Sequence, residues 1–198
     1  MVINLEGKTG ILYMDSKGKR IVTGFMFDSA TGKNLTEARL QDINRVVFSS
    51  IPLADSVTMG NPAETSKKVV VFTSPECDLC KVMHQEMKVV TRQRSDVAFI
   101  MKVVPINAKN PQSYENVRSI ACAKNNDEAL MRLEATYLNK TIPSPNCETS
   151  VVENTVALVN RLGINVLPAM VFEDGVKMGG ALRTEKEIRE LIDKHSRK

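Results

Sequence analysis

The sequence predicts an α/β fold in two unequal parts, a small β module followed by a larger domain. The first observation is an apolar run at 69–73, typical of a buried strand, that leads directly into an amphipathic helical segment. The second is the alternation of strand-like and helix-like runs from there to the end of the chain. The third is the tetrapeptide Cys77-Asp78-Leu79-Cys80, which stands where this strand meets the helix.

The N-terminal part predicts a β-hairpin and then a helix. Two β-like runs, 11–14 and 20–23, flank a turn composition that ends in Gly18. Asn34, with Glu37 three residues later, resembles a capping box and predicts the start of a helix. The apolar face of that helix consists of Leu40, Ile43 and Val47.

Pattern breakers place the boundary between the two parts. Proline-containing segments at 49–52 and 59–62 interrupt the periodicity ahead of the apolar strand. We therefore expect an N-terminal β module with a linker helix at 1–50, a linker at 51–66, and a catalytic domain at 67–198.

The larger domain predicts the order β-α-β, a helical insertion, and then α-β-β-α. Glu173-Asp174-Gly175 is the strongest hairpin signal in the chain, and Gly163 is a helix stop. This order matches a thioredoxin-like fold with a helical insertion at about 113–147. The expected strands lie at 69–73, 97–104, 169–172 and 176–178, and the expected helices include 79–90, 113–138, 152–162 and 188–192.

The pair Cys77 and Cys80 points to thiol–disulfide exchange. Two cysteines three residues apart at a helix start are close enough to pair, and the helix N-terminus stabilises the first as a nucleophilic thiolate. Cys77 is therefore the candidate nucleophile and Cys80 the resolving thiol. Half a zinc site has the same spacing, but Cys122 and Cys147 form no second short pair. A purely structural disulfide is also less favoured, because so short a loop constrains the unfolded chain very little.

The four cysteines form two plausible pairs with none left over, which suits an oxidising compartment. Cys122 and Cys147 are typical of a stapling disulfide, which would stabilise the fold by on the order of 3 kcal/mol. The alternative, that they are two unrelated buried free cysteines, stays open.

Composition and charge argue against several other classes of function. The 198 residues are 42% hydrophobic, and no apolar run is long enough to span a membrane. The net charge is +4, but basic residues are scattered except at 194–198, and three Tyr, six Phe and no Trp do not suggest nucleic-acid binding. Nothing predicts a metal or a cofactor, because Met83 and Met87 lie on an apolar helix face and favour packing over copper binding. The N-terminus lacks the features of a signal peptide, so we expect either a mature export product or a chain that is never exported.

Several separated segments resemble one family. The segment at 72–87, which contains both Cys77 and Cys80, is similar to the active-site strand and helix of the bacterial periplasmic disulfide isomerases, the DsbC/DsbG family. The segment at 120–125 resembles the part of that family that contains the first cysteine of its structural disulfide. Residues 10–28 are similar to the end of its N-terminal dimerisation module.

This resemblance implies a V-shaped homodimer in the periplasm that binds misfolded, wrongly disulfide-bonded proteins in its cleft. Cys77 would attack the substrate disulfide, and Cys80 or a substrate thiol would resolve the mixed disulfide. Pro168 corresponds to the family's cis-proline, and Leu167 before it would pair with an extended substrate strand. Cys122 and Cys147 would form the structural disulfide, and a membrane reductase of the DsbD type would supply electrons.

The sequence departs from the family pattern at three places. The N-terminal module is short, and about 35 residues cannot bury a core alone, so it must pair with another protomer or dock on the catalytic domain. Of these two arrangements we expect pairing, and a monomer is the alternative. Leu167 replaces the threonine that the isomerases usually have before the cis-proline. Glu76 and Asp78 place negative charge near Cys77, which predicts a less acidic nucleophile and a less oxidising site than in a DsbA-type oxidase.

Other functions remain as alternatives. The chain could be a monomeric thiol oxidase, a reductase of one client, or a non-catalytic chaperone or metal-tolerance protein. His84 lies two helical turns after Cys77, about 10 Å along the axis, which is too far for direct contact. We therefore expect a partly exposed helix histidine there, without a catalytic role.

Overall fold

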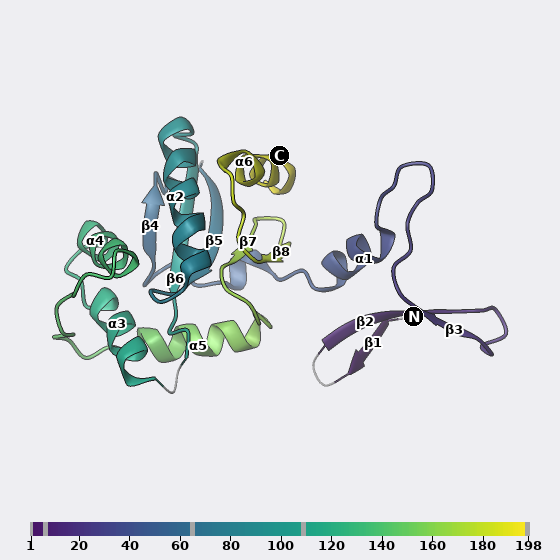
Figure 1. Ribbon diagram of the computed structural model, residues 1–198, viewed down its shortest axis with the longest axis horizontal. Helices are drawn as coiled ribbons and strands as arrows, with labels where there is room; N and C mark the ends of the chain where they lie inside the picture. Colours follow the sequence, from purple (N-terminus) through teal and green to yellow (C-terminus); the bar gives the residue numbers. More distant parts are fainter. Residues whose placement is uncertain (1, 6–7, 64–65, 108–109, 197–198) are drawn as a thin grey trace. The chain divides into compact units, whose positions relative to one another are not determined.

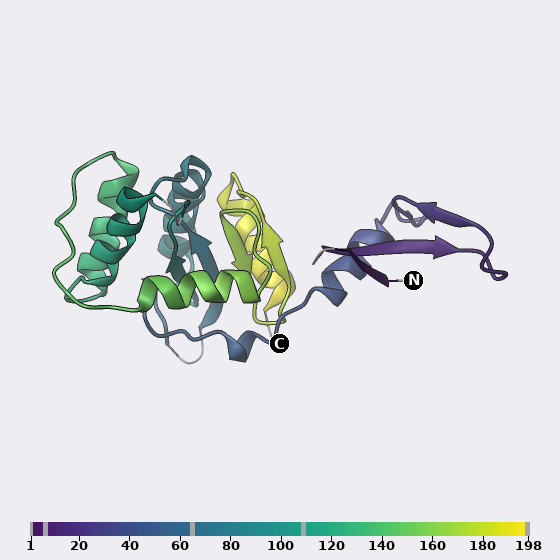
Figure 2. The same ribbon diagram turned by 90° about the horizontal axis from the view of Figure 1, so that it is seen from below.

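The computed structural model describes residues 2–5, 8–63, 66–107 and 110–196 (Figures 1 and 2). The chain divides into two compact units, Met1–Val46 and Val47–Lys198. Within the described ranges, no helix is both long enough and apolar enough to cross a membrane.

The first unit is a three-stranded antiparallel sheet followed by one helix. The strands are β1 (Val2–Leu5), β2 (Lys8–Met14) and β3 (Ile21–Thr23), in that order across the sheet, and the helix is α1 (Leu35–Ile43). The expected hairpin is formed by β2 and β3, whereas β1 was not predicted from the sequence. Among the side chains described in residues 10–46, only Thr36 is buried, so this unit has almost no core of its own.

Helix α1 begins where the capping box predicts and ends earlier than expected. The side chain of Asn34 accepts a hydrogen bond from the Glu37 amide at 3.0 Å. Asn44 ends the helix, because asparagine favours caps over helix interiors, and Val47 therefore lies outside it. Val47 is the N-cap of a short 3-10 helix, η1 (Phe48–Ser50), at the start of the second unit.

The second unit contains a five-stranded sheet in the order β4-β6-β5-β7-β8. Its strands β5 and β6 are parallel, and the other neighbouring pairs are antiparallel. This arrangement, with its helices and the N-terminal hairpin, confirms the predicted thioredoxin-like fold. The strands are β4 (Val57–Gly60), β5 (Lys67–Thr73), β6 (Val97–Val103), β7 (Ala169–Val171) and β8 (Lys177–Gly179).

Every residue of β6 is buried, because helices cover both faces of this sheet. Alternate side chains of β5 and β6, such as Val71 and Phe99, belong to one core cluster with Met87 of α2 and Ile188 of α6. Helices α2 and α6 also contact each other, while α5 contacts β6 (Figure 1). The helices are α2 (Asp78–Gln93), α3 (Pro111–Ala121), α4 (Asn126–Tyr137), α5 (Val151–Arg161) and α6 (Glu185–His195).

The structure differs from the expected elements at two places in this unit. The helical run expected at 113–138 is two helices, because Asn125 caps a new helix by accepting the Glu128 amide at 2.9 Å. The segment 51–66, expected to be a linker, contains β4, which pairs with β6. Its apolar alternation covers only Val57 and Met59, which is too short to give a periodic signal.

Candidate active site

The two closest cysteines lie at the start of α2, directly after the central strand β5. Cys77 is the N-cap of the helix, and its sulfur accepts a hydrogen bond from the Cys80 amide at 3.2 Å. The first amides of a helix have no partner within the helix, so they and the helix dipole favour negative charge on this sulfur. The structure joins Cys77 and Cys80 in a disulfide. The sequence-predicted pair is therefore in the geometry that thiol–disulfide exchange requires.

The two cysteines differ in exposure, although both are largely covered. Cys77 is 7% exposed and Cys80 is 1% exposed. Two neighbouring apolar side chains of α2, Leu79 and Val82, are exposed rather than buried in the core. The active-site end of α2 thus presents apolar side chains to solvent beside the cysteines.

A second chain segment meets the cysteines from the sheet. Strand β7 pairs antiparallel with β5, with Ala169 opposite Phe72. The residues just before β7 are consequently brought to the end of β5 that leads to Cys77. The bond between Leu167 and Pro168 is cis. Leu167 lines the same cavity as Cys77, so the structure brings together the site residues that lie far apart in the sequence.

An open cavity of about 470 Å³ lies beside Cys77. Its walls come from the segment after β6, from α5, and from the segment that leads to Pro168. Their side chains are uncharged and mostly apolar. Two of them, Ile106 and Val166, are also well exposed. The lining residues are Cys77, Val104, Pro105, Ile106, Val156, Val159, Asn160, Ile164, Asn165, Val166 and Leu167.

Sequence reasoning missed this cavity because its walls come from three separate segments. A helix at 152–162 was predicted, and Val156 and Val159 lie within it. Both are only partly buried and line the cavity instead of filling the core. The sequence signal for the cavity was the apolar face of this helix, which is larger than the core can cover.

His84 is buried, which corrects the expectation of a partly exposed histidine. Its side chain is 2% exposed, and Nε2 is hydrogen-bonded to Oε1 of Glu134 on α4 at 3.0 Å. The ring also packs against Tyr137, with 5.2 Å between the ring centroids. The Tyr137 hydroxyl in turn bonds to Thr73 Oγ1 at 2.7 Å, at the end of β5. The helical insertion is thereby tied to the strand that leads to Cys77.

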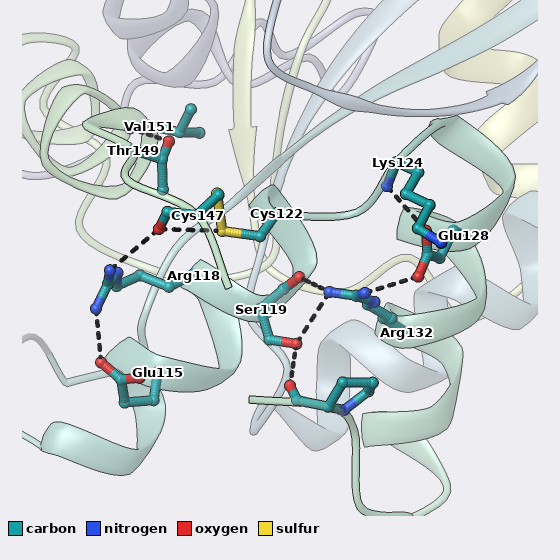
Figure 3. Close-up of a disulfide and its surroundings, with 11 residues drawn as sticks. Glu115, Arg118, Ser119, Cys122, Lys124, Glu128, Arg132, Cys147, Thr149 and Val151 are labelled. Carbon is teal, nitrogen blue, oxygen red and sulfur yellow. Dashed lines mark hydrogen bonds and ion pairs between the residues drawn. A yellow bond between two sulfur atoms is a disulfide. The ribbon is translucent and has the colours of Figure 1, made fainter. Parts of the chain in front are cut away.

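The other two cysteines are joined in a disulfide within the helical insertion (Figure 3). Cys122 is the C-cap of α3, and Cys147 lies in the long segment between α4 and α5. Arg118 donates hydrogen bonds to the Cys147 carbonyl at 3.3 Å and to Glu115 at 3.1 Å, as Figure 3 shows. All four cysteines of the chain are thus paired in two disulfides.

Comparisons with known proteins agree with this geometry. A family described as "Thioredoxin-like domain" matches residues 60–196. The probable thiol:disulfide interchange protein DsbC of Bordetella parapertussis is 29% identical over 182 residues, which cover 91% of this chain. The chain spans only 62% of that relative's length. The thiol:disulfide interchange protein DsbC of Salmonella typhimurium is 26% identical over 96% of this chain and 75% of the relative. These relatives confirm the resemblance stated from the sequence.

Two solved structures have the same fold. A disulfide interchange protein from Neisseria gonorrhoeae aligns with a TM-score of 0.61 and 22% identity, covering 75% of this chain and 100% of that chain. Proteus mirabilis ScsC in a compact conformation aligns with a TM-score of 0.56 and 21% identity, covering 71% of this chain and 73% of that one.

Proposed function

Because this chain belongs to the family of thioredoxin-like domains, we propose that it is a thiol:disulfide interchange protein that reduces and isomerises incorrect disulfides in exported proteins. The observation that supports this most directly is the Cys77 sulfur, which caps α2 and lines an open apolar cavity. The Bordetella and Salmonella relatives are named thiol:disulfide interchange proteins.

The proposed reaction begins with the reduced dithiol. The Cys77 thiolate attacks one sulfur of a substrate disulfide, which forms a mixed disulfide and releases the other substrate sulfur as a thiolate. If a second substrate thiolate attacks the mixed disulfide, the substrate leaves with a rearranged disulfide and Cys77 is regenerated. If the Cys80 thiolate attacks the Cys77 sulfur, the substrate leaves reduced and the Cys77–Cys80 disulfide forms. This second route needs an external two-electron donor, for which we propose a membrane reductase of the DsbD type.

The surroundings of Cys77 support misfolded proteins as substrates. Misfolded chains expose apolar side chains that a folded protein buries, and the exposed Leu79, Ile106 and Val166 offer apolar contacts close to the nucleophile. We propose that Leu167, before the cis-proline Pro168, contacts the substrate backbone. Leu167 in place of threonine gives that contact an apolar side chain without a hydroxyl.

A homodimer in the periplasm is part of the proposal. The unit Met1–Val46 has little core and exposes a set of large apolar side chains. A second copy of the same unit would cover them, as small units without a core usually require. The exposed side chains are Met14, Ile21, Val22, Phe25, Met26, Phe27 and Leu35. Two disulfides in one chain suit an oxidising compartment.

Trapping of the mixed disulfide tests the proposed function. Cys80→Ala removes the resolving thiol, so a denatured disulfide-containing protein should stay covalently attached through Cys77. The adduct is measured by mass spectrometry without reductant. Cys77→Ala is the control and should form no adduct. The proposal fails if Cys80→Ala forms none, or if both variants form the same amount.

A further inference from the structure

Glu76, the residue directly before Cys77, has both carboxylate oxygens occupied by hydrogen bonds. Oε2 accepts the hydroxyl of Ser74 at 3.0 Å and the hydroxyl of Ser113 at 2.9 Å. Oε1 accepts the side-chain amide of Asn116 at 2.8 Å. Ser113 and Asn116 belong to α3, so a residue of the active-site loop is anchored on the helical insertion.

The anchor also extends to the wall of the cavity. Ser74 and Ser113 are fully buried, so their hydroxyls have little access to water. The Ser113 hydroxyl that donates to Glu76 accepts the backbone amide of Ile106 at 3.1 Å. Ile106 lines the cavity beside Cys77. One buried hydroxyl therefore connects the loop before the nucleophile with the segment that faces it.

Glu76 places a negative charge directly before the proposed nucleophile. A negative charge nearby disfavours the thiolate, which opposes the effect of the helix N-terminus. Glu76 is itself exposed, so solvent weakens the influence of its charge on neighbours, and without partners its side chain would move freely. Three hydrogen bonds instead keep this carboxylate on one side of the loop. The other charges near Cys77 on α2 are Asp78 and Lys81, and the cavity lining is uncharged.

We propose that Glu76 is a positioning residue for the thiol exchange proposed above: its carboxylate, anchored on α3, holds a fixed negative charge beside Cys77 and makes that thiol less acidic. When a substrate thiol attacks the Cys77–Cys80 disulfide at Cys77, Cys80 leaves, and Cys77 leaves when a second substrate thiol attacks the mixed disulfide. A less acidic Cys77 is a poorer leaving group in that second step, so transfer of the disulfide to a substrate is less favourable. The anchored charge thus biases the site away from oxidation and toward reduction.

The test measures the acidity of Cys77 and does not depend on turnover of a client. In a Cys80→Ala background, Cys77 is the one free thiol of the chain, because Cys122 and Cys147 remain bonded to each other. The pH dependence of its alkylation by iodoacetamide, followed by mass spectrometry, gives the pKa. Glu76→Gln removes the charge at nearly constant size. We expect the pKa to fall by about half a unit, as for a unit charge several ångströms away in largely aqueous surroundings.

Two further variants separate the anchored charge from other effects. Glu115→Gln removes a carboxylate from the same helix that is paired with Arg118 instead, and it should leave the pKa of Cys77 unchanged. If Glu76→Gln shifts the pKa no more than Glu115→Gln does, the proposal is wrong. Glu76→Asp keeps the charge but is too short to keep all three hydrogen bonds, so its pKa should lie between those of the parent and Glu76→Gln. A pKa at or above the parent's would show that anchoring on α3 has no effect and would also overturn the proposal.

Discussion

The two cysteines of the candidate site differ in how accessible their sulfur atoms are. Cys77 caps α2 and borders an open cavity, whereas Cys80 is one helical turn farther and fully buried. Cys77 is therefore the more accessible of the two sulfurs. This difference supports the proposed roles of Cys77 as the attacking sulfur and Cys80 as the resolving sulfur.

His84 connects α2 to the helical insertion through the partly buried carboxylate of Glu134. Glu134, which binds Nε2 of His84, also accepts a hydrogen bond from Lys88 at 2.8 Å. Nδ1 of His84 is buried and has no hydrogen-bond partner among the described residues. Burial lowers the pKa of His84, and this effect exceeds the opposing effect of the hydrogen bond to Glu134. Burial alone would raise the pKa of Glu134, but its hydrogen bonds from Lys88 and His84 lower it overall.

Both shifts predict a loss of stability in acid. The folded state binds fewer protons than the unfolded state in each case, so the free energy of unfolding rises with pH. The contribution of His84 is complete above its ordinary pKa of 6.5 and is lost as the pH falls below that value. The contribution of Glu134 is complete above 4.5 and is lost below it.

Replacement of His84 should make the free energy of unfolding depend less on pH. In His84→Leu the free energy of unfolding should change less between pH 6.5 and pH 4.5 than in the parent, because no imidazole is left to protonate. Urea unfolding across this range measures the difference. Met87→Leu, a buried neighbour on the same helix that does not titrate, controls for repacking. Parallel curves for the parent and His84→Leu would contradict the role assigned to burial.

The sequence could predict the cysteine pair at α2 because spacing and a helix start are local features. It could not predict that His84 is buried, since its cover comes from Glu134 and Tyr137 about fifty residues later. The partners of Glu76 on α3 were hidden for the same reason. Contacts between distant segments leave no periodic signal in either segment.

Among the elements, the helical insertion depends on more than its apolar core. Arg132 of α4 is buried and donates to the backbone and hydroxyl of Ser119 on α3, and it pairs with Glu128 at 2.6 Å (Figure 3). The Cys122–Cys147 disulfide then ties the end of α3 to the segment before α5. The segment between α4 and α5 contains no regular element, so the crosslink is a main constraint on it.

Loss of this disulfide should destabilise the insertion without abolishing the chemistry. The crosslink spans 25 residues, and the double variant Cys122→Ala and Cys147→Ala should lower the free energy of unfolding by on the order of 3 kcal/mol. Chemical denaturation measures this value. Mixed-disulfide formation by Cys77 should persist under conditions where the variant is folded. An unchanged free energy of unfolding would show that the disulfide does not constrain the unfolded chain.

Elements were predictable where an uninterrupted pattern was long. Strands β5 and β6 contain apolar runs at 69–72 and 97–101, and the turn at Gly175 marked the hairpin of β7 and β8. Strand β4 was not predicted, because its four residues are too few to show a clear alternation of buried and exposed side chains. The expected single helix at 113–138 failed because a cap at Asn125 interrupts a sequence that is otherwise compatible with helix throughout.

At the scale of the whole molecule, the proposed homodimer can be tested at the exposed apolar side chains of the unit Met1–Val46. Phe25 is 66% exposed in the unit Met1–Val46, and Phe25→Asp places a charge among the exposed apolar side chains of that unit. The variant should have half the solution mass of the parent in light scattering, because burial of an unpaired charge is unfavourable. Met131→Asp, at a residue 64% exposed on α4, is the matched control and should keep the parent's mass. A parent that already has the mass of one chain would refute the dimer.

Refolding of a scrambled multi-disulfide protein tests the proposed isomerase activity. The assay follows the return of native activity in that substrate when the reduced parent protein is added, with Cys77→Ala as the control. We expect the parent to restore native disulfides, and Cys77→Ala to restore no more than the buffer alone. Equal recovery with the parent and Cys77→Ala, or reduction and oxidation of thiols without any rearrangement, would contradict it.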